Sequence, residues 1–123
     1  MNTRHAPLDA LRPEWKLWLS LDGEGVFGSG KWNLLDAIRR TGSLSAAAQS
    51  LGISYRKAWG ALRKAEQCLG VSLIERHRGG RTGGESCLTE AGEKWRAEYA
   101  RFQNEVETGV NRAFEHWLKR MMR

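Results

Sequence analysis

The chain has 123 residues, with 20 Lys and Arg against 14 Asp and Glu, and a formal net charge of +6. This length allows one domain with a real hydrophobic core. No segment has the long apolar run of a membrane span or the start of a signal peptide, so we expect a cytoplasmic protein without a membrane partner. The two cysteines cannot build a disulfide framework, and no catalytic or metal-ligating pattern occurs. We therefore predict no enzyme, no metal and no cofactor.

The first third of the sequence predicts a tail, a strand and a helix. Residues 1–12 lack any period and predict a loose tail. Residues 14–22 alternate between apolar and polar side chains, which predicts a half-buried strand. Its inward face consists of Trp15, Leu17, Leu19 and Leu21. A glycine-containing turn leads to a return strand that starts at Val26, and residues 31–41 predict a helix that Gly42 ends.

Residues 42–70 predict two short helices joined by a tight turn. Residues 44–51 form the first helix, with Ser43 as its cap and an inward stripe of Leu and Ala at helical spacing. Gly52 ends this helix, and Ser54 caps a second helix that reaches residue 69. A three-residue turn between two capped helices indicates a helix-turn-helix motif.

The second helix has one apolar face and one small, cationic face. At about 100° per residue, Ala58, Leu62 and Ala65 fall on one line with Leu69 and face the core. The opposite line and its shoulder suit the major groove of DNA, because they carry small and basic side chains. The predicted DNA-binding residues of this helix are Ser54, Tyr55, Arg56, Lys57, Gly60, Arg63 and Lys64. The alternative is an ordinary solvated helix face.

A basic hairpin, or wing, is predicted directly after the second helix. Residues 71–76 and 86–88 predict its two strands, and residues 77–85 between them contain four glycines and two arginines. We add these arginines, Arg78 and Arg81, to the DNA-binding residues, because they can follow the DNA backbone or enter a minor groove. Two alternatives stay open: a disordered connector with incidental charge, and an anion-binding nest of backbone amides.

The positive charge is concentrated on this motif. Residues 56–81 hold seven Lys and Arg and two acids, which gives +5 of the +6 carried by the whole chain. Charge gathered on one motif is typical of a surface that binds a polyanion. The helix-turn-helix favours duplex DNA as the partner, because the deep, narrow groove of A-form RNA excludes a helix. Within the motif, Arg56 and Arg63 are expected at base edges, and the wing arginines at the backbone.

Residues 89–120 predict one long helix. Its apolar residues recur about every 3.7 positions and form one stripe along it. The aromatic side chains on this stripe are costly to leave in water, so we predict that the helix joins two copies of the chain. The predicted dimer interface consists of Trp95, Tyr99, Phe102, Val106, Val110, Phe114 and Trp117. The alternative is a helix folded back over its own domain. We thus divide the chain into a tail (1–12), a winged helix-turn-helix (13–88) and a dimerisation helix (89–123).

Four segments resemble the DNA-binding domain of the ModE family, the bacterial molybdate-responsive transcription regulators. They are Gly42-Ser-Leu-Ser-Ala-Ala-Ala, Gly52-Ile-Ser-Tyr-Arg-Lys-Ala-Trp, Gly79-Gly-Arg-Thr-Gly-Gly and Leu88-Thr-Glu-Ala-Gly. The first and the last also resemble LysR-type regulators. The resemblance spans roughly residues 14–105. It implies a mainly α fold with a small β component, a winged helix-turn-helix with an N-terminal strand and a long C-terminal helix, which homodimerises and binds palindromic operators.

One feature of the ModE family has no counterpart in these 123 residues. Full-length ModE proteins carry a C-terminal pair of oxyanion-binding domains, so we expect this chain not to sense molybdate in that family's manner. It regulates without an effector, relies on a separate sensing partner protein, or senses another signal. A link to molybdate or tungstate transport genes follows only by analogy. Two other functions stay open: a small-molecule, metal or oxyanion sensor that uses the wing or Cys68 and Cys87, and a basic adaptor for an acidic protein.

Overall fold

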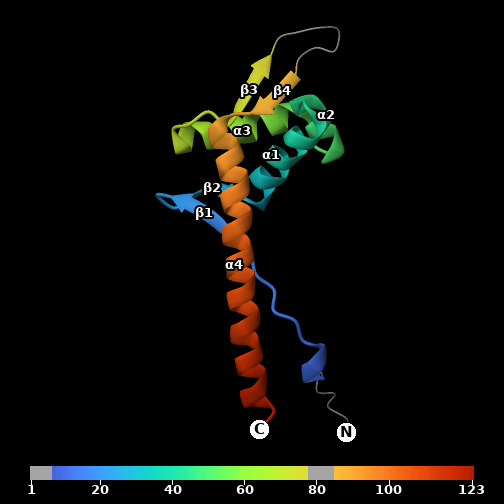
Figure 1. Ribbon diagram of the computed structural model, residues 1–123, viewed down its shortest axis with the longest axis vertical. Coiled ribbons are helices and arrows are strands. Elements are labelled where there is room, and N and C mark those ends of the chain that lie inside the picture. Colours follow the sequence, from blue (N-terminus) through green and yellow to red (C-terminus); the bar gives the residue numbers. More distant parts are fainter. Residues whose placement is uncertain (1–6, 78–84) are drawn as a thin grey trace. The chain divides into compact units, whose positions relative to one another are not determined.

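A computed structural model describes residues 7–77 and 85–123. It divides into two units, Leu17–Ala100 and a second unit formed by Met1–Lys16 with Arg101–Arg123. In chain order the elements are η1 (Leu8–Ala10), β1 (Trp18–Leu21), β2 (Glu24–Gly28), α1 (Ser29–Thr41), α2 (Leu44–Ser50), α3 (Tyr55–Leu69), β3 (Ile74–His77), β4 (Glu85–Leu88) and α4 (Glu90–Met121) (Figure 1). The predicted fold class, mainly α with a small β component in winged helix-turn-helix order, is confirmed.

The first strand pair is a tight antiparallel hairpin. Asp22 and Gly23 form its two-residue loop, with φ of 51° and 81°, a conformation that the Asp-Gly pair favours. The register shifts between Leu19 and Ser20, which leaves Val26 as an extra residue of β2. This bulge allows Val26 and the next residue, Phe27, both to be buried.

The strand predicted over residues 14–22 is too long. β1 begins only at Trp18, which pairs with Gly28, the last residue of β2. The chain turns into α1 at Ser29, so β2 is too short to pair with residues 14–17. Leu21 was predicted to face inward, but its side chain is 51% exposed, because it lies beside the hairpin loop and beyond the core. The tail also contains a short helix, η1, that the sequence did not indicate.

The helix-turn-helix has the predicted caps. The Ser43 hydroxyl accepts a hydrogen bond from Ala46 N at 3.0 Å, and the Ser54 hydroxyl accepts one from Lys57 N at 3.0 Å. Gly52, in the turn, and Gly70, which ends α3, both adopt the left-handed conformation with φ of 70°. α2 therefore leads into α3 through a short, fixed turn, which sets the direction in which α3 presents its outer face.

A single carboxylate joins the end of α3 to the strand pair that follows it. Glu66 accepts hydrogen bonds from Leu73 N at 2.7 Å and from Ile74 N at 3.4 Å. The sequence predicted a strand from Val71, but β3 starts at Ile74, because the Leu73 amide just before it binds the carboxylate instead of another strand. At the other side of the pair, Ser86 N donates to Gly42 O at 2.9 Å and ties β4 to the end of α1.

The beginning of α4 packs closely on Ser72 and Leu73, in the loop between α3 and β3. Thr89 N donates to Leu73 O at 3.0 Å, and the Thr89 hydroxyl donates to Ser72 O at 2.6 Å. Gly92 lies so close that a Cβ atom on it would overlap Leu73 O. The Leu-Thr-Glu-Ala-Gly segment thus has a structural role, because its threonine and its glycine both join α4 to the wing.

Aromatic side chains attach the next turns of α4 to the β1–β2 hairpin. The ring of Phe27 lies 5.0 Å from that of Trp95 and 5.1 Å from that of Tyr99, measured between centroids. The Tyr99 hydroxyl donates to Leu17 O at 2.7 Å, and burial raises the pKa of Tyr99 above its ordinary value. Aromatic pairs at these separations add to the free energy gained by burial.

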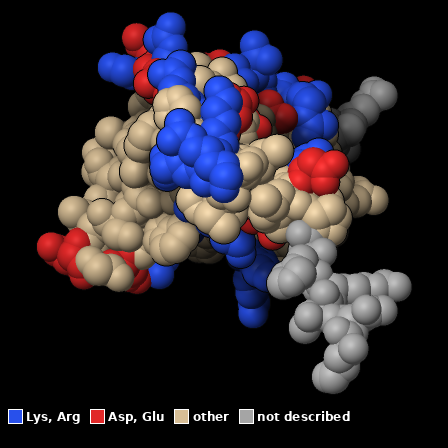
Figure 2. All heavy atoms as spheres, turned by 90° about the horizontal axis from the view of Figure 1, so that it is seen from below, with Lys and Arg blue, Asp and Glu red and all other residues tan. Residues whose placement is uncertain are grey.

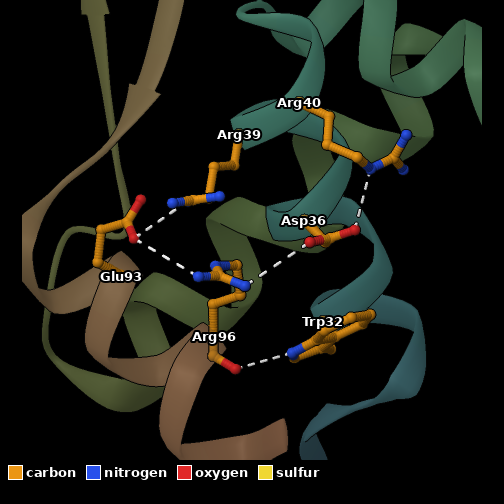
Figure 3. Close-up of polar contacts among 6 residues, drawn as sticks. All are labelled: Trp32, Asp36, Arg39, Arg40, Glu93 and Arg96. Carbon is orange, nitrogen blue, oxygen red and sulfur yellow. Dashed lines mark hydrogen bonds and ion pairs between the residues drawn. The ribbon is translucent and has the colours of Figure 1, made fainter.

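A chain of ion pairs joins α1 to α4 at the edge of the core (Figure 3). Arg96 of α4 lies between two carboxylates, with Nη1 at 3.7 Å from Asp36 of α1 and Nη2 at 3.8 Å from Glu93. Arg39 and Arg40 of α1 complete the chain at the Glu93 and Asp36 ends, respectively. In addition, the Trp32 indole donates to the carbonyl of Arg96 at 2.8 Å. These contacts fix the orientation of α4 within the Leu17–Ala100 unit.

The close contact at Gly92 predicts that Gly92→Ala destabilises the fold. The added methyl group would have to displace backbone, which costs about 1–3 kcal/mol in a packed site. We expect a lower melting temperature in a thermal unfolding experiment.

Gly109→Ala is the matched control in the same helix. A Cβ atom at Gly109 meets nothing within 4 Å, so alanine should stabilise the helix by about 0.5–1 kcal/mol. Equal melting temperatures for the two variants would contradict the proposed packing of α4.

Candidate nucleic-acid interface

α3 presents the two faces that the helical wheel predicts. Ala58, Leu62 and Ala65 are buried in the core, and Leu69 packs against it. The predicted DNA-binding residues of the helix are exposed: Ser54, Tyr55, Arg56, Lys57, Gly60, Arg63 and Lys64. The division of α3 into an inner and an outer face is therefore confirmed, whereas contact of the outer face with DNA stays a prediction.

Two features of the outer face allow another molecule to approach closely. A Cβ atom at Gly60 would meet nothing within 4 Å, so the backbone lies open at the middle of the face. Arg56 and Lys57, one turn earlier, form no ion pair with any residue in the described ranges, 7–77 and 85–123, and their charges are available to an anion. Ser54 has a structural role as the cap of the helix.

Trp59 brings two arginines together at one end of this face. The guanidinium carbon of Arg63, one turn further along α3, lies 5.6 Å from the centroid of the indole ring. The guanidinium carbon of Arg76, on β3, lies at the same distance from the same ring. Both distances are within the range of cation–π attraction. The indole ring thus links the outer face of α3 to the first strand of the wing.

One lysine of the outer face is already paired with a carboxylate. Lys64 Nζ lies 2.6 Å from an oxygen of Glu24, at the start of β2. The hydrogen bond and the charge of Lys64 lower the pKa of Glu24, and the same contact raises the pKa of Lys64. Both groups are exposed to solvent, so the contact contributes little to stability, but it neutralises one cation of the interface.

The wing carries part of the predicted site. β3 and β4 pair in register from Ile74 with Leu88 to His77 with Glu85, as expected for a hairpin. Arg78 and Arg81, predicted to contact the DNA backbone, lie outside the described residues. Arg76, on β3, lies in the described part of the wing, and its guanidinium lies over the ring of Trp59.

Two of the residues predicted for the dimer interface pack within the chain's own domain. Tyr99 is 3% exposed and belongs to its core, which leaves little of this side chain for a second copy. Trp95 packs on Phe27 but is only half-buried, so its part in a dimer stays a prediction. The sequence pattern did not separate them from the rest of the stripe, because the whole stripe has one helical period. The other five are half-buried or exposed, and their role stays a prediction: Phe102, Val106, Val110, Phe114 and Trp117.

Three further observations concern metal sites, cysteines and membrane-spanning helices in the described part of the chain. There, no group of three or more His, Cys, Asp and Glu side chains is placed to hold a metal ion. Cys68 is half-buried and Cys87 exposed, and the two are not joined by a disulfide. None of the described helices is both long and apolar enough to cross a membrane.

Basic side chains also lie outside α3 and the wing. The last turn of α4 carries Lys119 and Arg120. Seen from below, the molecule shows more surface formed by Lys and Arg than by Asp and Glu (Figure 2). Positive charge alone therefore does not define the interface, and tests of single residues need control variants with the same change of charge.

Three residues that lie at this candidate interface were not among the predicted site residues: Trp59, Arg76 and Glu24. Trp59 and Arg63 are four residues apart in one helix, and this spacing could have indicated their contact. Arg76 and Glu24 reach α3 from two different strands, and no local pattern indicates such contacts.

Comparison with known proteins agrees with this geometry. Residues 30–93 match the family described as bacterial regulatory helix-turn-helix proteins, lysR family. The chain is 38% identical over 92 residues to the molybdenum-pterin-binding protein MopB of Rhodobacter capsulatus, covering 75% of this chain and 33% of MopB. It is 40% identical over 62 residues to the DNA-binding transcriptional dual regulator ModE of Escherichia coli (strain K12), covering 50% of this chain and 24% of ModE. The chain thus spans a third or less of these relatives.

The fold also resembles a solved structure. The DNA-binding domain of CbnR, in a complex with DNA, superimposes with a TM-score of 0.56 and 24% sequence identity, covering 71% of this chain and 94% of that domain. At this identity the similarity concerns the fold.

The Lys64–Glu24 pair predicts that Glu24→Gln will strengthen binding of duplex DNA of any sequence. The substitution frees Lys64 for a phosphate, so the slope of log affinity against log salt should steepen by up to about 0.9. Fluorescence anisotropy with a labelled random-sequence duplex measures both quantities. Glu115→Gln, an exposed site on α4, removes the same charge elsewhere. An equal effect of both substitutions would mean that net charge alone is responsible.

Proposed function

The chain belongs to the LysR family of bacterial regulatory helix-turn-helix proteins, and from this we propose that it is a transcriptional regulator that binds duplex DNA sequence-specifically through α3. It acts in the cytoplasm as a homodimer on a palindromic operator.

The observation that carries this proposal is the outer face of α3. This face is exposed, basic at Arg56, Lys57 and Arg63, and open at Gly60, while the opposite face is fully packed. A helix of this kind fits the major groove, where arginine can form two hydrogen bonds to guanine. The wing that follows α3 supplies Arg78 and Arg81 for the backbone or the minor groove.

The names of the relatives support the same function and suggest its setting. One relative is a DNA-binding transcriptional dual regulator, and another is a molybdenum-pterin-binding protein. We extend the first to this chain as DNA binding, and the second as a link between its target genes and molybdate or tungstate metabolism. Direct sensing of molybdate is not part of the proposal.

The part of α4 beyond residue 100 supports a homodimer. An apolar stripe continues along it, and Phe114 and Trp117 stack with their ring centroids 5.8 Å apart. Phe102 and Trp117 are among its exposed large apolar side chains. Burying this stripe against a second copy would gain about 25 cal/mol per Å² of apolar area and place two α3 helices for two half-sites.

Selection from a random duplex library with the full chain tests the main proposal. We expect an inverted repeat with half-sites about 34–36 Å apart, or a multiple of this distance. Arg56→Ala should then cost roughly 1–3 kcal/mol on the selected duplex and relax the preference at particular bases.

Lys119→Ala, in the last turn of α4, serves as the control for loss of a positive charge. Selection without enrichment of any sequence would refute sequence-specific binding, and equal losses on selected and random duplexes would remove Arg56 from the base-reading residues.

The dimer is tested by a charge placed within the apolar stripe. Val110→Asp should convert the full chain to a monomer in sedimentation equilibrium and weaken binding of the palindrome, because two linked half-sites gain effective concentration only in a dimer. Thr108→Asp introduces the same side chain at an exposed position outside the stripe and should leave the dimer intact. A wild-type chain that is monomeric at micromolar concentration would overturn the dimer and the palindrome together.

A further inference from the structure

The contact of Trp59 with two arginines is not explained by the packing of the fold. Trp59 is 37% exposed, so its ring is not required to fill the core. The guanidiniums of two side chains from different elements, Arg63 of α3 and Arg76 of β3, lie over this ring instead.

The electrostatics of the cluster point to an anion. Each guanidinium carbon lies 5.6 Å from the ring centroid, so the two charges are no more than twice that distance apart. This separation is comparable with the screening length of about 10 Å at 0.1 M salt, so the charges repel each other. No carboxylate of the described residues forms an ion pair with either arginine. A bound anion between or beside them would relieve this repulsion.

The place of the cluster favours the DNA backbone as the source of that anion. The cluster lies where the outer face of α3 meets the wing, which are the two parts of the chain predicted to contact DNA. A helix in the major groove has the sugar-phosphate backbone at the rim of the groove, and this backbone receives about half to two-thirds of all protein–DNA hydrogen bonds.

We propose that Trp59, Arg63 and Arg76 form one composite phosphate site, in which the indole ring holds both guanidiniums against adjacent phosphates of one DNA strand. The proposal rests on the proposed DNA binding. Arg63, which the sequence predicts to read bases, then contacts the DNA backbone. Arg56 stays the base-reading arginine. Trp59 is a positioning residue, which acts through the two arginines and fixes α3 and the wing on the same stretch of backbone.

Binding of a random-sequence duplex at several salt concentrations tests the two arginines. Arg63→Gln and Arg76→Gln should each reduce the magnitude of the log–log salt slope by about 0.9, the value for one phosphate contact. Each substitution should lower the affinity for the random duplex and for the selected duplex by the same factor. Arg112→Gln, at an exposed position on α4, is the charge-matched control and should change the slope less.

Variants of Trp59 test the positioning role. Trp59→Leu should weaken binding about two- to fivefold, as expected for loss of an exposed cation–π contact, and keep the slope, because both charges remain. Trp59→Phe, which retains an aromatic ring, should restore part of the affinity. In a chain that already carries Arg63→Gln and Arg76→Gln, Trp59→Leu should have no further effect. Melting temperatures measured in parallel show whether each variant is folded.

The outcomes separate this inference from the proposed function. A wild-type chain that binds no duplex DNA refutes the proposed function. A wild-type chain that binds with a steep salt dependence, together with arginine variants that match Arg112→Gln, overturns the phosphate site alone. The site is also overturned if Arg63→Gln weakens only the selected duplex, because Arg63 would then read bases.

Discussion

The peptide groups around Leu73 are the point on which the positions of the other functional elements depend. The Leu73 amide binds the Glu66 carboxylate of α3, and its carbonyl accepts the amide that precedes α4. The Leu73 side chain is completely buried, and Gly92 packs against its carbonyl. A buried peptide must have both of its polar groups satisfied. Here one partner lies in α3 and the other directly before α4, so a single residue ties α3, the wing and α4 together.

This arrangement explains how a small domain can hold a reading helix and a wing in a fixed relation. The outer face of α3 contributes nothing to the core, and β3 and β4 are only four residues each. The strands β3 and β4 are held on the core side of the domain. Glu66 of α3 binds the amide before β3, and Ser86 of β4 binds the end of α1. Trp59 adds a link on the outer side. The middle of the outer face, at Arg56, Lys57 and Gly60, is thereby left open to a ligand.

The sequence predicts those parts of the fold that depend on local chemistry. The caps at Ser43 and Ser54 and the stop at Gly70 involve residues within one turn of each other, and all three are confirmed. The errors occur where a distant residue competes with a local preference. Glu66 binds the amide of Leu73, which a strand from Val71 would need for pairing. The same limit applies to the interface: the outward direction of α3 follows from its periodicity, but the contacts of Arg76 and Glu24 cross between elements and depend on the tertiary structure.

The bond from Tyr99 to Leu17 connects residues that are 82 positions apart, and the indole bond from Trp32 to Arg96 spans 64. During synthesis on the ribosome the chain emerges from its N-terminus at about 5–20 residues per second. The β1–β2 hairpin is therefore complete several seconds before the helix that covers Phe27 exists. In that interval Phe27 lacks the rings of Trp95 and Tyr99, which later pack on it. The Leu17–Ala100 unit can close only after the first turns of α4 have been synthesised. This holds even though the helix-turn-helix between β2 and α4 is built from local contacts.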